Sequence, residues 1–180
     1  MPSLAENHAA RAAAFLAAAR GDVLAALPPD PHAVILDLAC GAGATGALAL
    51  KDGKCGAYVG IEANPAAASE ARFAISDVVV GDLATVAIPG DPKTFDVVIA
   101  GSALAGLADP PGFLGRLVPL MRPGGRLFAA IPAGSPHRWE KIIRRAGLVQ
   151  DAPKPRKGLA RLFAKPPKAP YDLRAHKRWR

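Results

Sequence analysis

The feature that most constrains this chain is a short apolar run that ends in an acid and breaks into a glycine-rich turn. It occupies residues 34–46, which read VILDLACGAGATG, and an Ala/Leu-rich segment able to form a helix follows it. A strand that turns sharply into a helix leaves backbone N–H groups facing a crevice, and glycine lets a ligand approach that backbone without an intervening Cβ. The stretch therefore predicts the start of a nucleotide-binding α/β fold.

The glycines alone do not identify the nucleotide. Gly41-x-Gly43-x-x-Gly46 also matches the dinucleotide fingerprint, and glycines after a strand can serve only a tight turn. The position of the acid is more discriminating. Asp37 lies four residues before Gly41, where a dinucleotide fold usually has apolar residues.

Carboxylates stand at the ends of three consecutive apolar runs. Glu62 ends the run AYVGIE, 25 residues after Asp37, and Asp82 follows the run VVVG, 20 residues further on. The carboxyl ends of parallel strands meet at one edge of a sheet, which is where open α/β sheets bind ligands. Taken singly, two of these carboxylates have a purely structural explanation. Asp82 can be a turn residue, and Glu62 can be a solvated strand end before a helix cap.

The series resembles the class I methyltransferases that use S-adenosylmethionine. The first motif of that family reads acid-x-Gly-x-Gly-x-Gly, and this chain has Asp37-x-Ala39-x-Gly41-x-Gly43, with alanine in place of the first glycine. The match continues through a fourth strand, FDVVIA, and through LMRPGGRLF, the turn into a fifth strand. It covers about residues 30–165.

The resemblance implies a role for each part of the cofactor site. Asp37 would lie near the methionine amino group, and Gly41 and Gly43 would line the methionine and ribose. Glu62 would accept hydrogen bonds from both ribose hydroxyls, since a carboxylate has several acceptor sites. Asp82 would accept from the adenine amine, with the next residue against the ring. The cofactor-binding residues implied in this way are Asp37, Ala39, Gly41, Gly43, Glu62, Ala63, Asp82, Leu83 and Gly101.

The fold implied by the resemblance is α/β and Rossmann-like, a doubly wound, mostly parallel seven-stranded sheet with a C-terminal antiparallel hairpin. Residues 148–150 and 158–164 would form that hairpin. We expect one S-adenosylmethionine-binding domain over residues 1–165, including an N-terminal helix within residues 1–27. Residues 166–180 would be a basic, proline-rich tail.

Local signals place several helices. Residues 4–26 are Ala-rich and predict one helix, ended by the prolines that follow. Asn64 and Asp109 each precede proline, which is a good helix start, and Pro119 should kink or end the second of these helices early. Helical spacing after Pro136 makes Trp139 a core residue. The expected buried anchors of the first helix are Leu4, Phe15, Leu16, Val23 and Leu24.

Composition limits the class of protein. A chain of 180 residues fits one domain, and no apolar run is long enough to span a bilayer. Cys40 and Cys55 form no disulfide framework, and no Cys/His spacing indicates zinc, so we expect no metal. The absence of a basic-then-apolar leader makes a cytoplasmic protein the simplest expectation.

The basic charge is concentrated near the C-terminus. Residues 154–180 hold ten Lys or Arg and one acid, whereas residues 1–153 hold 13 basic and 14 acidic residues. Cations interleaved with Tyr171 and Trp179 suit an RNA backbone with base stacking, and equally suit an acidic partner, an anionic lipid or a solvated tail. The partner of this segment stays open.

The donor site is easier to predict than the acceptor site. Methyl transfer from a sulfonium is an in-line displacement, so the enzyme mainly aligns the reactants and excludes water. Relatives often carry an acid and a Glu-His pair after the fourth strand, but residues 103–106 are small or apolar here. Ser102 and His137 are the nearest polar candidates, each with a simpler turn or helix-start role, so the catalytic residue is left unassigned. We expect an open acceptor cleft, partly covered by residues 4–26.

Three hypotheses remain. The first is an S-adenosylmethionine-dependent methyltransferase with a small-molecule or lipid- or glycan-linked acceptor. The second is a non-catalytic S-adenosylmethionine-binding module that docks a partner or RNA through its basic tail. The third, a nicotinamide-dependent oxidoreductase, rests only on the glycine spacing.

Overall fold

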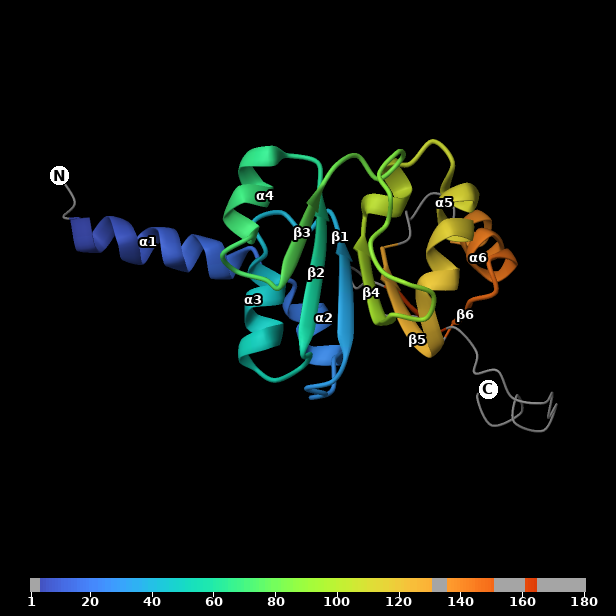
Figure 1. The fold of residues 1–180 in the computed structure, drawn as a ribbon, viewed down its shortest axis with the longest axis horizontal. Coiled ribbons are helices and arrows are strands. Elements are labelled where there is room, and N and C mark those ends of the chain that lie inside the picture. Colours follow the sequence, from blue (N-terminus) through green and yellow to red (C-terminus); the bar gives the residue numbers. More distant parts are fainter. Residues whose placement is uncertain (1–3, 131–135, 151–160, 165–180) are drawn as a thin grey trace. The chain divides into compact units, whose positions relative to one another are not determined.

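The computed structural model describes residues 4–130, 136–150 and 161–164 (Figure 1). The chain divides into two compact units, Met1–Pro89 and Gly90–Arg180. Each unit is an α/β arrangement with its own core. The whole C-terminal tail expected over residues 166–180 lies outside the described residues.

The first unit is built on three parallel strands in the order β3-β2-β1. β1 pairs in parallel with β2, and β2 pairs in parallel with β3, so each connection crosses over through a helix. The three carboxyl ends therefore lie at one edge. The elements are α1 (Leu4–Ala17), α2 (Gly21–Ala26), β1 (Val34–Leu38), α3 (Ala44–Lys51), β2 (Ala57–Glu62), α4 (Pro65–Ala71) and β3 (Asp77–Val80).

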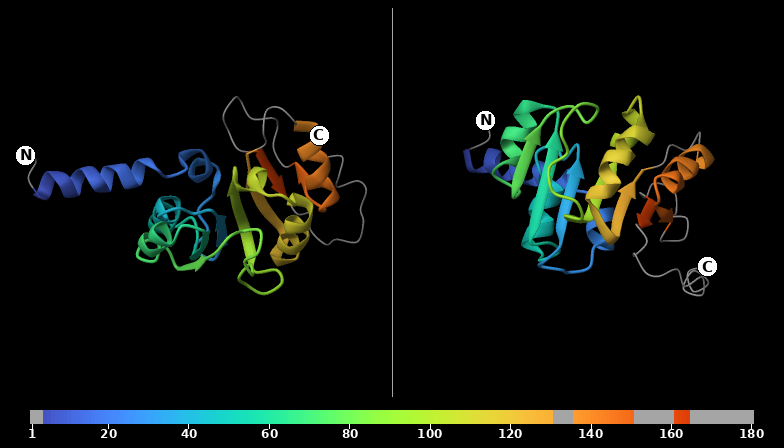
Figure 2. Two further views of the ribbon diagram at one scale, coloured as in Figure 1. Left: turned by 90° about the horizontal axis from the view of Figure 1, so that it is seen from above. Right: turned by 45° about the vertical axis from the view of Figure 1, so that its right-hand side comes forward.

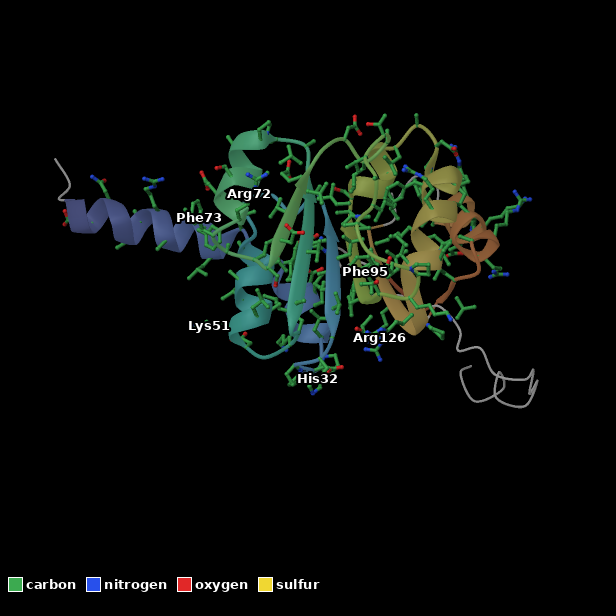
Figure 3. The ribbon with its side chains drawn as sticks, viewed as in Figure 1. His32, Lys51, Arg72, Phe73, Phe95 and Arg126 are labelled. Carbon is green, nitrogen blue, oxygen red and sulfur yellow. The ribbon has the colours of Figure 1, made fainter. Side chains whose placement is uncertain are left out.

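Helix α3 packs closely on the sheet because it carries a glycine at the contact. A Cβ added at Gly46 would overlap the Tyr58 ring and Ile75. Tyr58 is fully buried, as are Ile61 on the same strand and Ile35 on β1. Figure 3 shows His32, just before β1, and Lys51, at the end of α3, at the amino-terminal end of the strands, opposite the edge where the strands terminate.

The predicted start of α4 is confirmed. The Asn64 side chain accepts hydrogen bonds from the N–H groups of Ala66 at 2.9 Å and Ala67 at 3.4 Å, and Pro65 begins the helix. Two of the otherwise unpaired N–H groups at the helix start are satisfied in this way. This cap fixes the chain direction immediately after β2.

The prediction of one helix over residues 4–26 was wrong. Helix α1 ends at Ala17 and α2 begins at Gly21. Between them the backbone N–H of Arg20 donates to the Thr45 hydroxyl at 3.0 Å, which ties the break to α3. α1 extends away from the sheet of this unit (Figures 1 and 2). Leu16, expected to be buried, is 48% exposed, whereas Val23 in α2 is buried as expected.

The second unit contains the strand order β4-β5-β7-β6. β4 and β5 are parallel, and β7 runs antiparallel to β5 and to β6. Its elements are β4 (Phe95–Gly101), the 3-10 turn η1 (Ala103–Gly106), α5 (Pro110–Leu117), the 3-10 turn η2 (Val118–Leu120), β5 (Met121–Ala129), α6 (Pro136–Arg145), β6 (Val149–Gln150) and β7 (Arg161–Ala164).

Three local predictions hold in this unit. The Asp109 carboxylate accepts from the Gly112 N–H at 3.0 Å and caps α5, and the α-helix stops before Pro119. Trp139 is 7% exposed and packs in the core. Within the described ranges, no helix combines the length and apolar character needed to cross a membrane.

Replacing Gly46 by Ala should lower the free energy of unfolding by about 1–3 kcal/mol, because the added methyl group overpacks the buried Tyr58 contact. Chemical denaturation measures the change. The matched control is Gly115→Ala in α5, where an added Cβ meets nothing within 4 Å. That variant should be unchanged or more stable by up to about 1 kcal/mol, since alanine favours a helix interior. Equal effects at the two positions would contradict the close packing of α3.

Candidate cofactor-binding site

The turn between β1 and α3 is made of left-handed backbone. Ala39, Gly41 and Gly43 have φ values of 61°, 58° and 85°. The N–H groups of Ala39 and Cys40 both donate to the Ile61 carbonyl, at 2.8 and 3.2 Å, so the turn is held against the end of β2. The position where the resemblance expects glycine and this chain has Ala39 thus adopts a conformation that glycine prefers.

Glu62 is tied to this turn by its side chain. Its carboxylate accepts from the Gly41 N–H at 2.8 Å and, through the other oxygen, from the Asn64 N–H at 2.8 Å. A carboxylate has about four lone-pair sites, so each oxygen keeps room for a further donor such as a ribose hydroxyl. A Cβ added at Gly41 would meet nothing within 4 Å, so the backbone of the turn faces open space at this glycine.

Asp37 lies deeper than the tip of its strand. It is the fourth residue of β1, only 6% exposed, and its Oδ2 accepts a 2.6 Å hydrogen bond from the Tyr58 hydroxyl. Burial raises the pKa of Asp37 to about 7, the Tyr58 hydrogen bond and the Arg20 charge oppose that rise, and Glu62 adds to it. Asp37 and Glu62 therefore interact electrostatically on one side of the sheet.

Asp82 occupies the turn after β3. It is exposed, and its Oδ1 accepts from the Ala84 N–H at 2.8 Å. This hydrogen bond fits the role of a turn residue. The Gly81 N–H donates to the Glu62 carbonyl at 3.0 Å, which places this turn next to the end of β2. Leu83 is half-buried and Ala63 is exposed at the same edge.

Gly101 belongs to the second unit. It ends β4 with a φ of 48°, and its carbonyl accepts from the Ala130 N–H at 2.6 Å. The first unit thus brings together the edge that carries Asp37, Ala39, Gly41, Gly43, Glu62, Ala63, Asp82 and Leu83. The roles of all nine residues toward a cofactor stay predictions.

Sequence reasoning missed Tyr58 and Arg20. Tyr58 sits in an otherwise apolar strand, and the parallel register pairs Ile35 with Tyr58 and Asp37 with Gly60. Alternation along β2 then puts the Tyr58 and Asp37 side chains on the same face. The available signal was a tyrosine two residues before Gly60, the residue of β2 that pairs with Asp37. Arg20, which forms a 2.9 Å ion pair with Asp22, gave no comparable signal.

The turn after β4 offers no acid or base. Leu104 of η1 is buried in the core, and the exposed Ser102 makes no side-chain cap on this turn. His137 is the second residue of α6, with a side chain 91% exposed and 3.8 Å from Glu140. The exposed place of His137 in the first turn of α6 supports its interpretation as a helix-start residue.

Replacing Ala39 by Gly should stabilise the protein by about 0.5–1 kcal/mol. Glycine relieves the left-handed strain of about 1–2 kcal/mol, partly offset by its larger unfolded-state entropy. Thermal and chemical denaturation report the change. Ala42→Gly, in the same turn but without a positive φ, should be neutral or destabilising. A stabilising Ala42→Gly together with a destabilising Ala39→Gly would refute the conformation described here.

The buried Asp37 should make stability depend on pH. The folded protein holds its proton to about pH 7, whereas the unfolded chain loses it near pH 4, so the folded state binds more protons in between. The free energy of unfolding should therefore fall as the pH rises from about 4 to 7, by on the order of 3–4 kcal/mol for this group. Chemical denaturation between pH 4 and 7 should show that the free energy of unfolding falls less steeply in Asp37→Asn than in the wild type. Asp91→Asn, at an exposed position, is the control and should show the same pH dependence as the wild type. The same pH dependence in all three proteins would contradict the burial of Asp37.

Comparison with known proteins identifies the family. A family model described as "Methyltransferase domain" matches residues 36–127, which include the turn and all three carboxylates. A Deinococcus radiodurans protein named trans-aconitate 2-methyltransferase is 28% identical over 130 residues, covering 68% of this chain and 46% of that protein. A Bos taurus protein named 18S rRNA (guanine-N(7))-methyltransferase is 31% identical over 150 residues, covering 72% of this chain and 52% of that protein. The chain thus spans about half the length of these relatives.

Solved structures agree. The crystal structure of a TehB-like SAM-dependent methyltransferase from Corynebacterium glutamicum has a TM-score of 0.67 and 26% identity, covering 89% of this chain and 97% of that one. A putative Haloferax volcanii methyltransferase in complex with the activator Trm112 has a TM-score of 0.63 at 19% identity and shares the fold. The expected α/β Rossmann-like class is confirmed, and the oxidoreductase hypothesis finds no support. This chain belongs to the methyltransferase-domain family of class I, S-adenosylmethionine-dependent methyltransferases.

Proposed function

We propose that this chain transfers a methyl group from S-adenosylmethionine to a small-molecule or lipid- or glycan-linked acceptor. The observation that supports the donor site most directly is the Glu62 carboxylate, which accepts from the N–H of Gly41, a glycine whose Cβ position is open. Membership in the family supplies the cofactor, and the hydrogen bonds of Glu62 support a ribose contact at this carboxylate. The residues at this edge therefore fit S-adenosylmethionine.

Each part of the cofactor has a proposed contact. Glu62 accepts from the ribose hydroxyls with the lone pairs left over from its two backbone hydrogen bonds. Asp37 faces the methionine ammonium, and the backbone at Gly41 and Gly43 lies along the methionine and ribose. Asp82 accepts from the adenine amine with its second oxygen, since Oδ1 already caps its own turn.

The reaction asks little acid–base chemistry of the protein. S-adenosylmethionine would supply an activated methyl group there, with the electron pair of the carbon–sulfur bond left on sulfur. The chain's task is alignment and exclusion of water. Because η1 carries no acid or base, the proposed acceptor atom has a lone pair available at neutral pH and needs no early loss of a proton.

The acceptor itself is open to experiment. One relative is named for trans-aconitate and another for a guanine of 18S rRNA, so relatives at similar identity carry different acceptors in their names. Labelled methyl incorporation in cell extract would identify the acceptor class. Release of S-adenosylhomocysteine in that assay supports transfer, whereas cofactor binding without release favours the non-catalytic module.

Further expectations remain part of this proposal. They are a single domain ending at residue 165, seven strands with a C-terminal hairpin, a cytoplasmic location, and a basic tail over residues 166–180 that contacts RNA or an acidic partner. The charge of that tail supports a polyanionic contact. Truncation after residue 165, followed by binding assays with single-stranded RNA, tests the contact.

Replacing Glu62 by Ala should weaken S-adenosylhomocysteine binding by about 1–3 kcal/mol, roughly 5- to 150-fold in Kd, because two ribose contacts and the anchor of Gly41 are lost. Isothermal titration calorimetry measures the affinity. Glu70→Ala, which removes an exposed carboxylate from α4, is the charge-matched control and should bind like the wild type. An unchanged Kd for Glu62→Ala would remove Glu62 from the site.

A further inference from the structure

Asp37 and Tyr58 form a buried pair that the proposed transfer chemistry does not explain. The Tyr58 hydroxyl donates to Asp37 Oδ2 at 2.6 Å, and the tyrosine ring lies so close to Gly46 of α3 that an added Cβ there would overlap it. Tyr58 is 0% exposed. Its hydroxyl is therefore fixed on one oxygen of the carboxylate by packing as well as by the hydrogen bond.

The second oxygen of Asp37 is left for another partner. Oδ1 accepts no hydrogen bond from the described residues, and every fully buried side-chain oxygen or nitrogen in that part of the chain has one. Oδ1 therefore reaches the small accessible area that Asp37 retains. A carboxylate locked through one oxygen and accessible through the other is arranged to receive a cationic donor.

The groups around Asp37 set its charge. From β2, Tyr58 stabilises the ionised carboxylate by hydrogen bonding and Glu62 repels it. Arg20, which precedes α2, favours ionisation, but its own ion pair with Asp22 offsets part of that charge. Cys40 stays a neutral thiol, because burial and the two carboxylates raise its pKa to about 12. With desolvation dominant, burial raises the pKa of Asp37 to about 7.

We infer that Tyr58 is a positioning residue that holds Asp37 ready to exchange its proton for the ammonium group of the cofactor. This inference rests on the proposed function. In the free protein near neutral pH, part of the Asp37 population is protonated. When the ammonium group binds at Oδ1, the carboxyl proton passes to solvent and the carboxylate remains, paired with the ligand cation. Cofactor binding is thereby coupled to release of a proton, and Tyr58 sets the pH at which the exchange occurs.

The test is calorimetry of the full chain with S-adenosylhomocysteine between pH 5.5 and 8.5, in two buffers of different ionisation enthalpy. The expected result is release of up to one proton per ligand below pH 7, with affinity rising up to about tenfold per pH unit and levelling above pH 8. The ligand 5′-methylthioadenosine, which lacks the amino acid end, should show neither effect. Proton-independent binding of S-adenosylhomocysteine overturns this inference alone, whereas absence of binding at every pH overturns the proposed function.

Tyr58→Phe separates positioning from a structural role. Loss of the hydroxyl removes the hydrogen bond that favours the carboxylate, so the inflection should move to higher pH by about one unit. Affinity at pH 7 should then fall about fivefold, with a smaller loss at pH 8.5. Asp37→Asn should bind without proton release. Equal weakening of Tyr58→Phe at all pH values, for both ligands, would show a merely structural tyrosine.

A second measurement needs no folded Tyr58 variant. Carbon-13 NMR of the free wild-type protein, with the Asp37 carboxyl assigned by its absence in Asp37→Asn, should give a titration midpoint near pH 7. A midpoint below pH 5 would overturn the inference. The free protein and the ligand titration thus report on the same proton independently of any methyl-transfer activity.

Discussion

The hydrogen bond from the Gly41 N–H to the Glu62 carboxylate is the interaction on which the rest of the site depends. It joins the glycine-rich turn after β1 to the end of β2, and the same carboxylate reaches forward to the Asn64 N–H at the start of α4. One side chain thereby fixes the turn, the strand end and the helix start. A binding edge assembled from backbone in this way stays open to a ligand because glycine contributes no side chain to fill it.

The burial of Asp37 is a consequence of the same architecture. In a parallel sheet covered by helices, a residue one position inside the strand end is cut off from water, and a carboxylate there is destabilised unless it finds a donor. Gly46 lets α3 approach the sheet, that approach pins Tyr58, and Tyr58 supplies the donor. The packing glycine, the tyrosine and the aspartate form one causal chain from helix packing to the electrostatics of the site.

Much of this arrangement was accessible from the sequence. Apolar runs that end in or near an acid located β1, β2 and β3, and the Asn64 and Asp109 caps located helix starts, because each signal is local in the sequence. The acidic register at Asp37 and Glu62 also indicated one shared edge. Those predictions succeeded where neighbouring residues along the chain determine the outcome.

What could not be predicted depends on contacts between distant residues. The segment over residues 4–26 is Ala-rich, and Gly21 is a weak local signal because a single glycine does not by itself end a helix. The break at Arg20 is held by Thr45 across 25 residues of sequence. The Tyr58–Asp37 hydrogen bond requires the strand register, which propensity does not give. Ala39 shows the converse: the family pattern expects glycine there, and the backbone keeps the left-handed φ with alanine in place. The turn is thus over-determined by its hydrogen bonds to Ile61, and the fold tolerates the local strain because those bonds hold the turn against the end of β2.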